Sequence, residues 1–349
     1  MSSSHVAILV GPRAVLKSNK HAAAAAGRVA EPVEGIWEIT LPTPWPIGPV
    51  NVFVIDDPLT LIDTGPIHDP TLAALEAGLA GLGYRIEDLE RIVLSHQHPD
   101  HWGLAQPLAT RSGAVIHGLR DLGPWLADYP ASLRDEDRFG DALLARHGGD
   151  PATAGGQYSL DIPFGASVEA IDPLDDGDVL EFAGRRLGVL HRPGHSRSDT
   201  VFWDADTGSL IGADHVLTRP SVPLISPPLT GPPETVRPRA LRSYRESLLR
   251  TRRLEAEVIL TGHGEAIPDP GAAIDRWLSR WFAATERLRA VVDEQPRTAL
   301  ELAARVRGSI DAAKELFAIC ETLGYLDELI DAGLVVEHAG EAIARFSLA

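Results

Sequence analysis

One loop of this chain reads Ser95-His96-Gln97-His98-Pro99-Asp100-His101-Trp102-Gly103 and directly follows a short apolar run that is typical of a buried strand. Neutral imidazole suits zinc and neighbouring first-row metals, and a carboxylate adds a hard oxygen ligand. Four ligands on one tight loop cannot all face the same ion. His96 and His98 are therefore expected to point toward one position, and Asp100 and His101 toward a second. The spacing predicts two neighbouring metal ions that are completed by ligands from elsewhere in the chain.

This motif resembles that of the metallo-β-lactamase superfamily, whose pattern calls for three later ligands in order. The chain has His195 in Arg-Pro-Gly-His-Ser, Asp214 in Ile-Gly-Ala-Asp-His and His263 in Thr-Gly-His-Gly. All three follow apolar runs and lie in glycine-containing turns, where the backbone can pass close to an ion. The resemblance covers about residues 36–268. It implies an α/β fold, the αββα sandwich, with two packed sheets, helices outside and the metals at one open edge.

The resemblance also implies how the ligands divide between two divalent ions. One ion would be held by His96, His98 and His195, the other by Asp100, His101 and His263, with Asp214 as the bridge. Zinc is the expected metal, and iron or manganese stays open. Asp63, at the end of a predicted strand over 59–65, corresponds to a family acid that supports the metal loop, because metal-bound histidines usually donate their other N–H to such a group. A plain turn aspartate is the alternative.

Composition narrows the class of protein. A length of 349 residues is sufficient for two domains, and a content of 44% apolar residues is sufficient for a large hydrophobic core. The formal net charge of −17 opposes binding to nucleic acid or to an anionic membrane. Cys320 is the single cysteine, which excludes an intramolecular disulfide and fits a reducing cytosol. There is no apolar run of about 18 residues, so no membrane span is expected. The pattern predicts a cytoplasmic protein.

Residues 1–268 are expected to form the catalytic domain, although residues 1–35 have no readable role. An insertion at about 119–162, with helices predicted over 119–126 and 135–147, is placed to form a lid over the metals. A proline-rich segment over 220–238 is expected at the rim of the same mouth. Side chains expected to touch the substrate are Trp102, Leu217, Trp125 and Tyr129. The substrate would be a small molecule.

Residues 271–349 are predicted to form a second domain of helices followed by a hairpin, which resembles a winged helix. The expected helices cover 274–294, 298–306, 312–317 and 321–332. Winged helices often bind nucleic acid, but this region holds 13 acidic and 9 basic side chains. Because a phosphate-binding surface needs lysine or arginine, packing or homodimer formation is the preferred role.

Two metals can share a bridging hydroxide that attacks a carbonyl carbon or a phosphorus atom, and Asp100 could take up its proton. Members of the family that degrade β-lactam antibiotics lack an acid corresponding to Asp214. Its lactonases carry a tyrosine where this chain has Leu217, and its persulfide dioxygenases use one iron with fewer ligands. Hydrolysis of an ester or thioester of a hydrophobic acyl compound is therefore preferred. The alternatives are a phosphodiesterase or endoribonuclease, a lactonase, and a non-catalytic protein that the metals stabilise.

Overall fold

A computed structural model describes residues 27–219, 221, 223–229, 237–338 and 342–349. The expectations for residues 1–26 and for parts of the proline-rich segment lie outside these residues. Among the described residues, no helix is both long enough and apolar enough to cross a membrane.

The larger of two main sheets has seven strands that lie in the order of the chain. They are β1 (Val29–Val33), β2 (Ile36–Leu41), β3 (Val50–Ile55), β4 (Thr60–Ile62), β5 (Arg91–Val93), β6 (Val115–Leu119) and β7 (Asp172–Leu174). Pairing is antiparallel from β1 to β4 and parallel from β4 to β7. The predicted hairpin of 50–55 with 59–65 is confirmed as the antiparallel pair β3–β4.

The second sheet has five strands in the order β12-β11-β10-β9-β8. They are β8 (Val179–Phe182), β9 (Arg185–His191), β10 (Thr200–Asp204), β11 (Ser209–Ala213) and β12 (Val258–Thr261). Only β11 and β12 run parallel in this sheet; the other neighbours are antiparallel.

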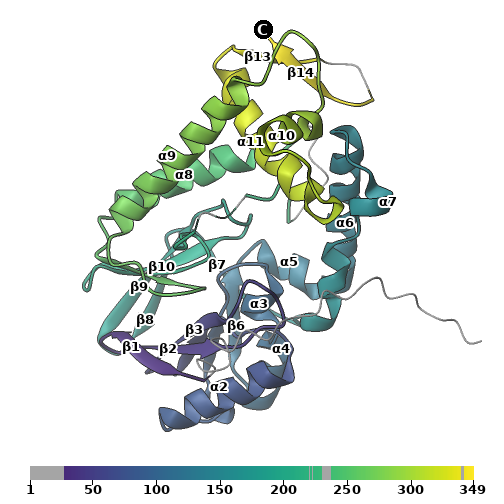
Figure 1. Ribbon diagram of the computed structural model, residues 1–349. Helices are drawn as coiled ribbons and strands as arrows, with labels where there is room; N and C mark the ends of the chain where they lie inside the picture. Colours follow the sequence, from purple (N-terminus) through teal and green to yellow (C-terminus); the bar gives the residue numbers. More distant parts are fainter. Residues whose placement is uncertain (1–26, 220, 222, 230–236, 339–341) are drawn as a thin grey trace, which may run out of the picture.

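The two sheets pack face to face because successive side chains of their central strands are apolar on both faces. On β3, Phe53 joins the core between the sheets, whereas Val52 and Val54 join the core beneath the outer helices. On β10, Phe202 faces the other sheet and Val201 faces outward. Strands covered on both faces read as continuous apolar runs rather than as alternating ones. The expected layer order of helix, sheet, sheet and helix is confirmed (Figure 1).

The outer face of the first sheet is covered by short helices and one longer one. These are α2 (Asp69–Gly81), η1 (Ile86–Asp88), α3 (Pro99–Trp102), α4 (Ala105–Ser112) and α5 (Leu122–Ala127). The outer face of the second sheet is covered by α8 (Ala240–Arg252) and α9 (Pro270–Arg289).

The insertion differs from its prediction in both structure and surroundings. It folds into α5, α6 (Tyr129–Arg146), α7 (Pro151–Ala154) and η2 (Tyr158–Phe164). Helix α6 begins earlier than predicted because Asp128 caps it, accepting a hydrogen bond from the Ala131 N–H. Its far end is bound to the C-terminal region, since the Leu300 N–H donates to the His147 carbonyl over 3.2 Å. The insertion is therefore braced at its far end rather than free.

The C-terminal region continues with α10 (Ala299–Arg307), η3 (Ala312–Lys314), α11 (Glu315–Asp331) and the hairpin of β13 (Val335–His338) and β14 (Arg345–Leu348). The prediction of separate helices over 312–317 and 321–332 is wrong, because α11 runs unbroken through Ala318-Ile319-Cys320, which are all buried. Arg297, just before α10, forms a β-bridge with Phe346. This order of elements suits a winged helix, and that assignment stays a prediction.

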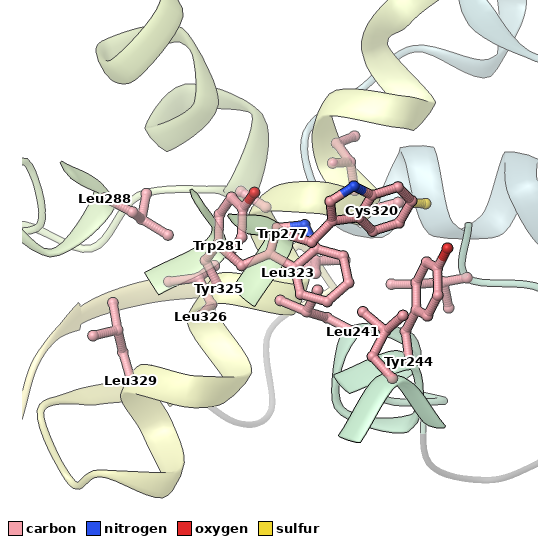
Figure 2. Close-up of a cluster of buried hydrophobic side chains, with 14 of the residues drawn as sticks. Leu241, Tyr244, Trp277, Trp281, Leu288, Cys320, Leu323, Tyr325, Leu326 and Leu329 are labelled. Carbon is pink, nitrogen blue, oxygen red and sulfur yellow. The ribbon is translucent and has the colours of Figure 1, made fainter. Parts of the chain in front are cut away.

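The C-terminal region shares its core with the sandwich. Trp277 and Trp281 of α9 pack against Tyr244 of α8, with ring centroids 5.9 and 5.2 Å away (Figure 2). The same cluster includes Leu323 of α11 and Leu210 of β11. The predicted boundary near residue 270 coincides with the start of α9, but the hydrophobic core is continuous across it.

Candidate metal centre

Every predicted metal ligand lies just beyond the C-terminal end of a strand. β5 of the first sheet leads into residues 96–101, and three strands of the second sheet, β9, β11 and β12, lead to His195, Asp214 and His263. The ends of strands from both sheets thus meet at one edge. His98 and His195 are partly exposed, and the other five ligands are buried. The arrangement places the side chains on a rigid support with one open side.

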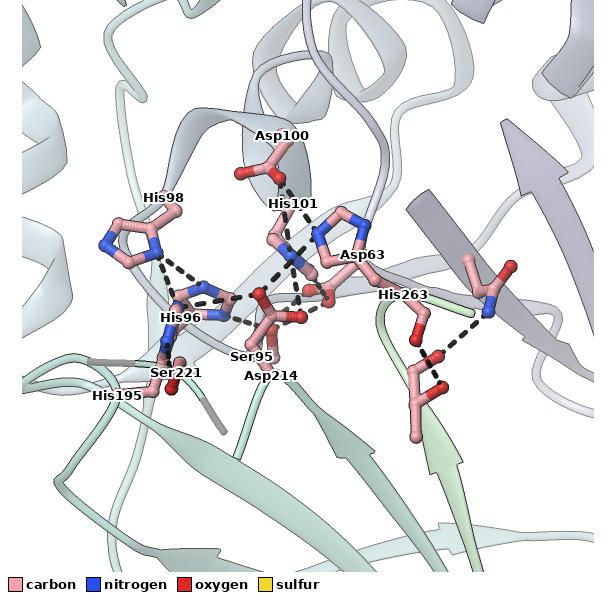
Figure 3. A network of polar contacts seen from close by, with 12 residues as sticks. Asp63, Ser95, His96, His98, Asp100, His101, His195, Asp214, Ser221 and His263 are labelled. Carbon is pink, nitrogen blue, oxygen red and sulfur yellow. Dashed lines mark hydrogen bonds and ion pairs between the residues drawn. The ribbon is translucent and has the colours of Figure 1, made fainter. Parts of the chain in front are cut away.

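The first group consists of His96, His98 and His195 (Figure 3). The Nδ1 atom of His98 lies 3.1 Å from Nε2 of His96 and 2.9 Å from Nε2 of His195. Nitrogen atoms around a tetrahedral zinc are separated by roughly 3.3 Å, because each Zn–N bond is about 2.0–2.1 Å long. The three nitrogens are therefore spaced as ligands of one ion.

The second group consists of Asp100, His101 and His263. The Nε2 atom of His263 lies 3.1 Å from Oδ2 of Asp100, and Nε2 of His101 lies 3.8 Å from the same oxygen. Asp214 approaches both groups, with one carboxylate oxygen 3.5 Å from Nε2 of His195 and also 3.5 Å from Nε2 of His263. It is thus placed to serve both groups.

Two buried atoms at this centre show that the residues fit a metal ion. Nε2 of His101 and Oδ1 of Asp214 lie 3.4 Å apart, and neither makes a hydrogen bond within the described part of the chain. Buried polar atoms almost always have a partner, and a bound ion is one of the ordinary explanations for an exception. Both atoms belong to the expected ligand set, so a cation between the groups would satisfy them.

The protonation states of His195 and Asp100 suit metal binding; despite burial, the carboxylate of Asp214 raises the pKa of His101 and of His263, and a bound cation would take the place of their protons. Burial, and then the neighbouring His98, lowers the pKa of His195 to about 3, which keeps its imidazole neutral. Burial would raise the pKa of Asp100, but His101 and His263 outweigh it and hold that pKa at about 2. Neutral imidazole and ionised carboxylate are the forms that bind metals.

Asp63 forms hydrogen bonds that fix the metal loop after β5. Its Oδ2 atom accepts hydrogen bonds from Nδ1 of His101 over 2.8 Å and from Oγ of Ser95 over 2.7 Å. Its Oδ1 atom accepts from the Ser95 N–H over 2.9 Å, and Oγ of Ser95 lies 3.0 Å from Nδ1 of His96. The backbone at Asp63 has φ +60°, a conformation that non-glycine residues adopt rarely and usually near functional sites. Its position is the one expected of the supporting acid.

Replacing Asp63 by asparagine should weaken metal binding about 10- to 100-fold, the usual cost of losing such a supporting partner. The carboxylate accepts three hydrogen bonds through its two oxygens, whereas the amide has one acceptor oxygen and would place an NH2 group against a donor. Competition with a chelator of known affinity measures the effect. Asp206→Asn, on the exposed turn between β10 and β11, is the matched control. Unchanged affinity in Asp63→Asn would contradict the supporting role.

Three further supports were not found from the sequence. The Pro49 carbonyl accepts a hydrogen bond from Nδ1 of His263 over 2.7 Å. Oγ of Ser221 lies 3.3 Å from Nδ1 of His195 and 3.3 Å from the hydroxyl of Tyr244. Ser221 lies in the proline-rich segment and Tyr244 on an amphipathic helix, so neither residue type nor spacing signals this role.

Gly262 shows why glycine is needed beside these ligands. A Cβ atom there would lie 2.4 Å from Oδ1 of Asp214 and 2.7 Å from Cε1 of His101. Both contacts are too close for a side chain, so only glycine fits where this turn passes between Asp214 and His101.

Gln97, between two of the ligands, ties the metal loop to the rest of the site. Its side-chain oxygen accepts from Oγ of Ser198 over 2.7 Å, on the loop that follows His195. Its amide group donates to Glu136 of α6 over 3.5 Å. The insertion therefore touches the metal loop through a buried carboxyl group.

Glu136→Gln should stabilise the protein increasingly as pH rises. Burial raises the pKa of Glu136 to about 7 from 4.5. Between these values the folded state keeps a proton that the unfolded state has released, so stability falls as pH rises, by about 3 kcal/mol for this shift. The variant lacks this loss. Urea unfolding at pH 5 and pH 8 should show its advantage only at the higher pH. Exposed Glu169→Gln controls for the lost charge, and an advantage independent of pH would contradict the prediction.

A cavity of about 730 Å³ opens beside the ligands and differs from the expected pocket. Its wall includes Trp45, Leu160, Phe164 and Phe317, together with His98 and other ligands. These wall residues come from three segments far apart in the sequence: the β2–β3 connection, η2 and α11.

The structure does not place the four expected pocket residues on this wall. Trp102, Trp125 and Tyr129 are buried against one another behind the metal loop, with the Trp102 and Tyr129 ring centroids 4.6 Å apart. Trp102 also donates a hydrogen bond to the Gln97 carbonyl over 2.8 Å. Leu217 lines a separate pocket beside Trp277. Burying these aromatic rings beneath the metal loop stabilises the loop more than leaving them exposed in the cavity would. The three aromatic residues therefore belong to the core.

Comparisons with known proteins agree with this geometry. The family model of the metallo-beta-lactamase superfamily matches residues 45–263. A probable metallo-hydrolase of Bacillus subtilis is 30% identical over 304 residues, which cover 85% of this chain and 92% of that protein. A crystal structure of a metallo-beta-lactamase family protein from Thermus thermophilus has a TM-score of 0.74 at 28% identity, covering 91% of this chain and 99% of that one. An acyl-coenzyme A thioesterase of Bos taurus is 42% identical over 52 residues, 14% of this chain and 19% of that protein. The ligand order, the sandwich and these matches together show that the chain belongs to the metallo-beta-lactamase superfamily.

Proposed function

We propose that this chain hydrolyses an ester or thioester of a hydrophobic acyl compound, with two divalent metal ions held by the seven residues of the metal centre. Its family makes it a metal-dependent hydrolase; the substrate class and the number of ions are our proposal. One observation carries the substrate class. Among the described residues that line the cavity there is no lysine or arginine, and large apolar side chains dominate its wall.

The charge of the cavity favours a neutral acyl group over a polyanion. Its acidic lining residues are Asp100, Asp161 and Asp214. A phosphodiester entering this cavity would lose hydration and meet no cationic side chain from the described wall. An acyl chain instead gains about 25 cal/mol for each Å² of apolar surface that the wall covers. Bound metal ions offset part of the negative charge of these carboxylates. They do not provide a cationic surface along which a polyanionic chain could bind.

The residues of the chain have separable roles in this reaction. Bound divalent metals supply Lewis acidity and an activated water at neutral pH. Asp63 and the Pro49 carbonyl fix the ring orientations of His101 and His263. Asp100 borders the cavity and is ionised, so its carboxylate is placed to accept a proton. The apolar wall holds the body of the substrate and excludes water from the scissile bond.

The C-terminal region supports the acyl proposal rather than nucleic-acid binding. Helix α11 is the one that would enter a groove in a winged helix, and its acidic face is already paired within the molecule. Asp327 accepts two hydrogen bonds from Arg237, and Glu328 pairs with Arg245 over 2.5 Å. A partner nucleic acid would have to displace these pairs while facing acidic side chains.

The similarity to an acyl-coenzyme A thioesterase covers a short segment, and it supports a thioester among the acyl substrates. The test compares kcat/KM for acyl thioesters and esters with that for a phosphodiester and a short RNA, using protein of measured metal content. We expect turnover of the hydrophobic acyl substrates. Faster turnover of either phosphorus substrate would overturn the acyl proposal and favour the phosphodiesterase alternative.

A further inference from the structure

Three exposed hydrophobic side chains from separate segments gather at the cavity that holds the metal ligands. Ile47 is 55% exposed on the β2–β3 connection, Leu160 is 66% exposed on η2, and Phe317 is 46% exposed on α11. Exposed apolar groups that gather at one place mark binding surfaces more often than scattered ones do. Their continuity with His98, Asp100 and His195 in one cavity identifies what would cover them, namely the body of the molecule that is cleaved.

Phe317 reaches this cavity because its helix is anchored beside it. Leu316, the preceding residue, is buried and packs against α6, where a Cβ atom on Gly140 would lie 3.3 Å from its side chain. Leu316 and Phe317 both line the cavity. Successive residues of a helix point about 100° apart, so Leu316 is buried against the insertion while Phe317 stays exposed. The Asp150 N–H also donates to Glu315 over 3.4 Å. The first turn of α11 is thus held against the insertion, and its aromatic ring forms part of a braced wall.

The part of the wall that includes Leu160 is held by a second set of contacts. Trp45 and Phe164 pack edge to face with ring centroids 4.7 Å apart, and Nε1 of Trp45 donates to Asp161 over 3.1 Å. These contacts join the β2–β3 connection to η2, the segment that carries Leu160. Both parts of the wall are therefore formed before any ligand arrives.

We infer that Phe317 of the C-terminal region, together with Leu160, sets the preference of the enzyme for acyl-chain length. This inference rests on the proposed acyl substrate and deepens it. Leu160 and Phe317 are 66% and 46% exposed, whereas the expected metal ligands in the same cavity are buried or only partly exposed. With the reacting end of the substrate at the ligands, these two side chains on the solvent side of the cavity would cover a more distant part of the acyl chain. A short acyl group does not reach them, and a long one does. The C-terminal region thereby becomes part of the substrate site.

The test measures kcat/KM of metal-loaded protein for a series of acyl esters from acetyl to dodecanoyl. Phe317→Ala should lower the dodecanoyl-to-acetyl ratio about tenfold, the loss expected when roughly two methylene groups are no longer covered. Leu160→Ala should act in the same direction. Phe282→Ala, which removes a more exposed phenylalanine of α9 outside this cavity, should leave the ratio unchanged. Equal loss for all chain lengths, or none, would overturn the inference while the acyl function stands.

A second measurement does not depend on turnover. Metal-loaded protein should bind 1-decanol more tightly than 1-butanol by calorimetry, and Phe317→Ala should weaken binding of the decanol alone. If no ester or thioester is hydrolysed, the proposed function fails. The difference in alcohol binding then still shows whether the affinity of the cavity depends on chain length. If Phe317→Ala converts an oligomer into a smaller species in solution and binds both alcohols as the wild type does, Phe317 belongs to a protein interface. That result would overturn the inference.

Discussion

Asp214→Ala is expected to lower kcat/KM by about three orders of magnitude and to reduce metal occupancy at both positions. Metal ions contribute several kcal/mol of transition-state stabilisation, and each 1.36 kcal/mol corresponds to tenfold in rate. Asp214 has carboxylate oxygens within 3.5 Å of His101, His195 and His263. It thus contacts members of both ligand groups, and its loss should be felt by both.

Elemental analysis beside kinetics checks this result. Wild-type protein should carry close to two ions per chain, and the variant fewer than one. The matched control is Asp206→Ala, at an exposed position on the turn that precedes β11, which should keep full occupancy and activity. Wild-type protein that holds at most one ion when metal is in excess would contradict the dinuclear centre. Full occupancy in Asp214→Ala would contradict its shared role.

Trp277→Ala is expected to lower the free energy of unfolding of the whole chain by about 3–5 kcal/mol, the usual cost of removing a buried aromatic ring. Trp277 is 2% exposed and packs against Tyr244 of α8 and Trp281 of its own helix. Because this cluster continues into β10 and β11, the C-terminal region and the sandwich should unfold together.

Thermal unfolding followed with simultaneous detection of metal release tests this coupling. One transition should be seen, and Trp277→Ala should shift it and the metal release by the same amount. Phe282→Ala, five residues along the same helix and 70% exposed, should change stability by no more than about 0.5 kcal/mol. A separate, earlier transition in Trp277→Ala with metal release unchanged would show that the region beyond residue 270 is energetically independent.

The ligands expected on the metal loop could be predicted from sequence because three histidines and an aspartate stand within residues 96–101 directly after an apolar run. Several imidazole and carboxylate groups clustered on one loop suit a first-row metal, and a strand places the next residues at the edge of its sheet. His96 was identifiable for this reason, whereas His195 and His263 were identified through the resemblance to the metallo-β-lactamase superfamily. The αββα fold followed from the family resemblance, and apolar runs such as Val50–Ile55 agree with it because they require cover on both faces.

The cavity wall was decided by packing between segments that are distant in the chain. Hydrophobicity alone cannot distinguish an aromatic ring that fills a core from one that lines a cavity. Trp102 and Tyr129 were expected at the substrate and are core, whereas Trp45 and Phe317 line the cavity. Trp45 owes its place to a partner 116 residues away, Asp161. No local pattern encodes such a contact.

By itself the sequence determined which atoms can bind metal, because ligand chemistry belongs to each side chain and the strand before it. Only the tertiary structure decided what surrounds the metals. The insertion and α11 meet through Gly140 and Leu316, and this packing holds the turn of α11 that adds Leu316 and Phe317 to the cavity wall. The surface that a substrate meets is the sum of many weak apolar contacts, and these are specified by the fold as a whole rather than by any one stretch of chain.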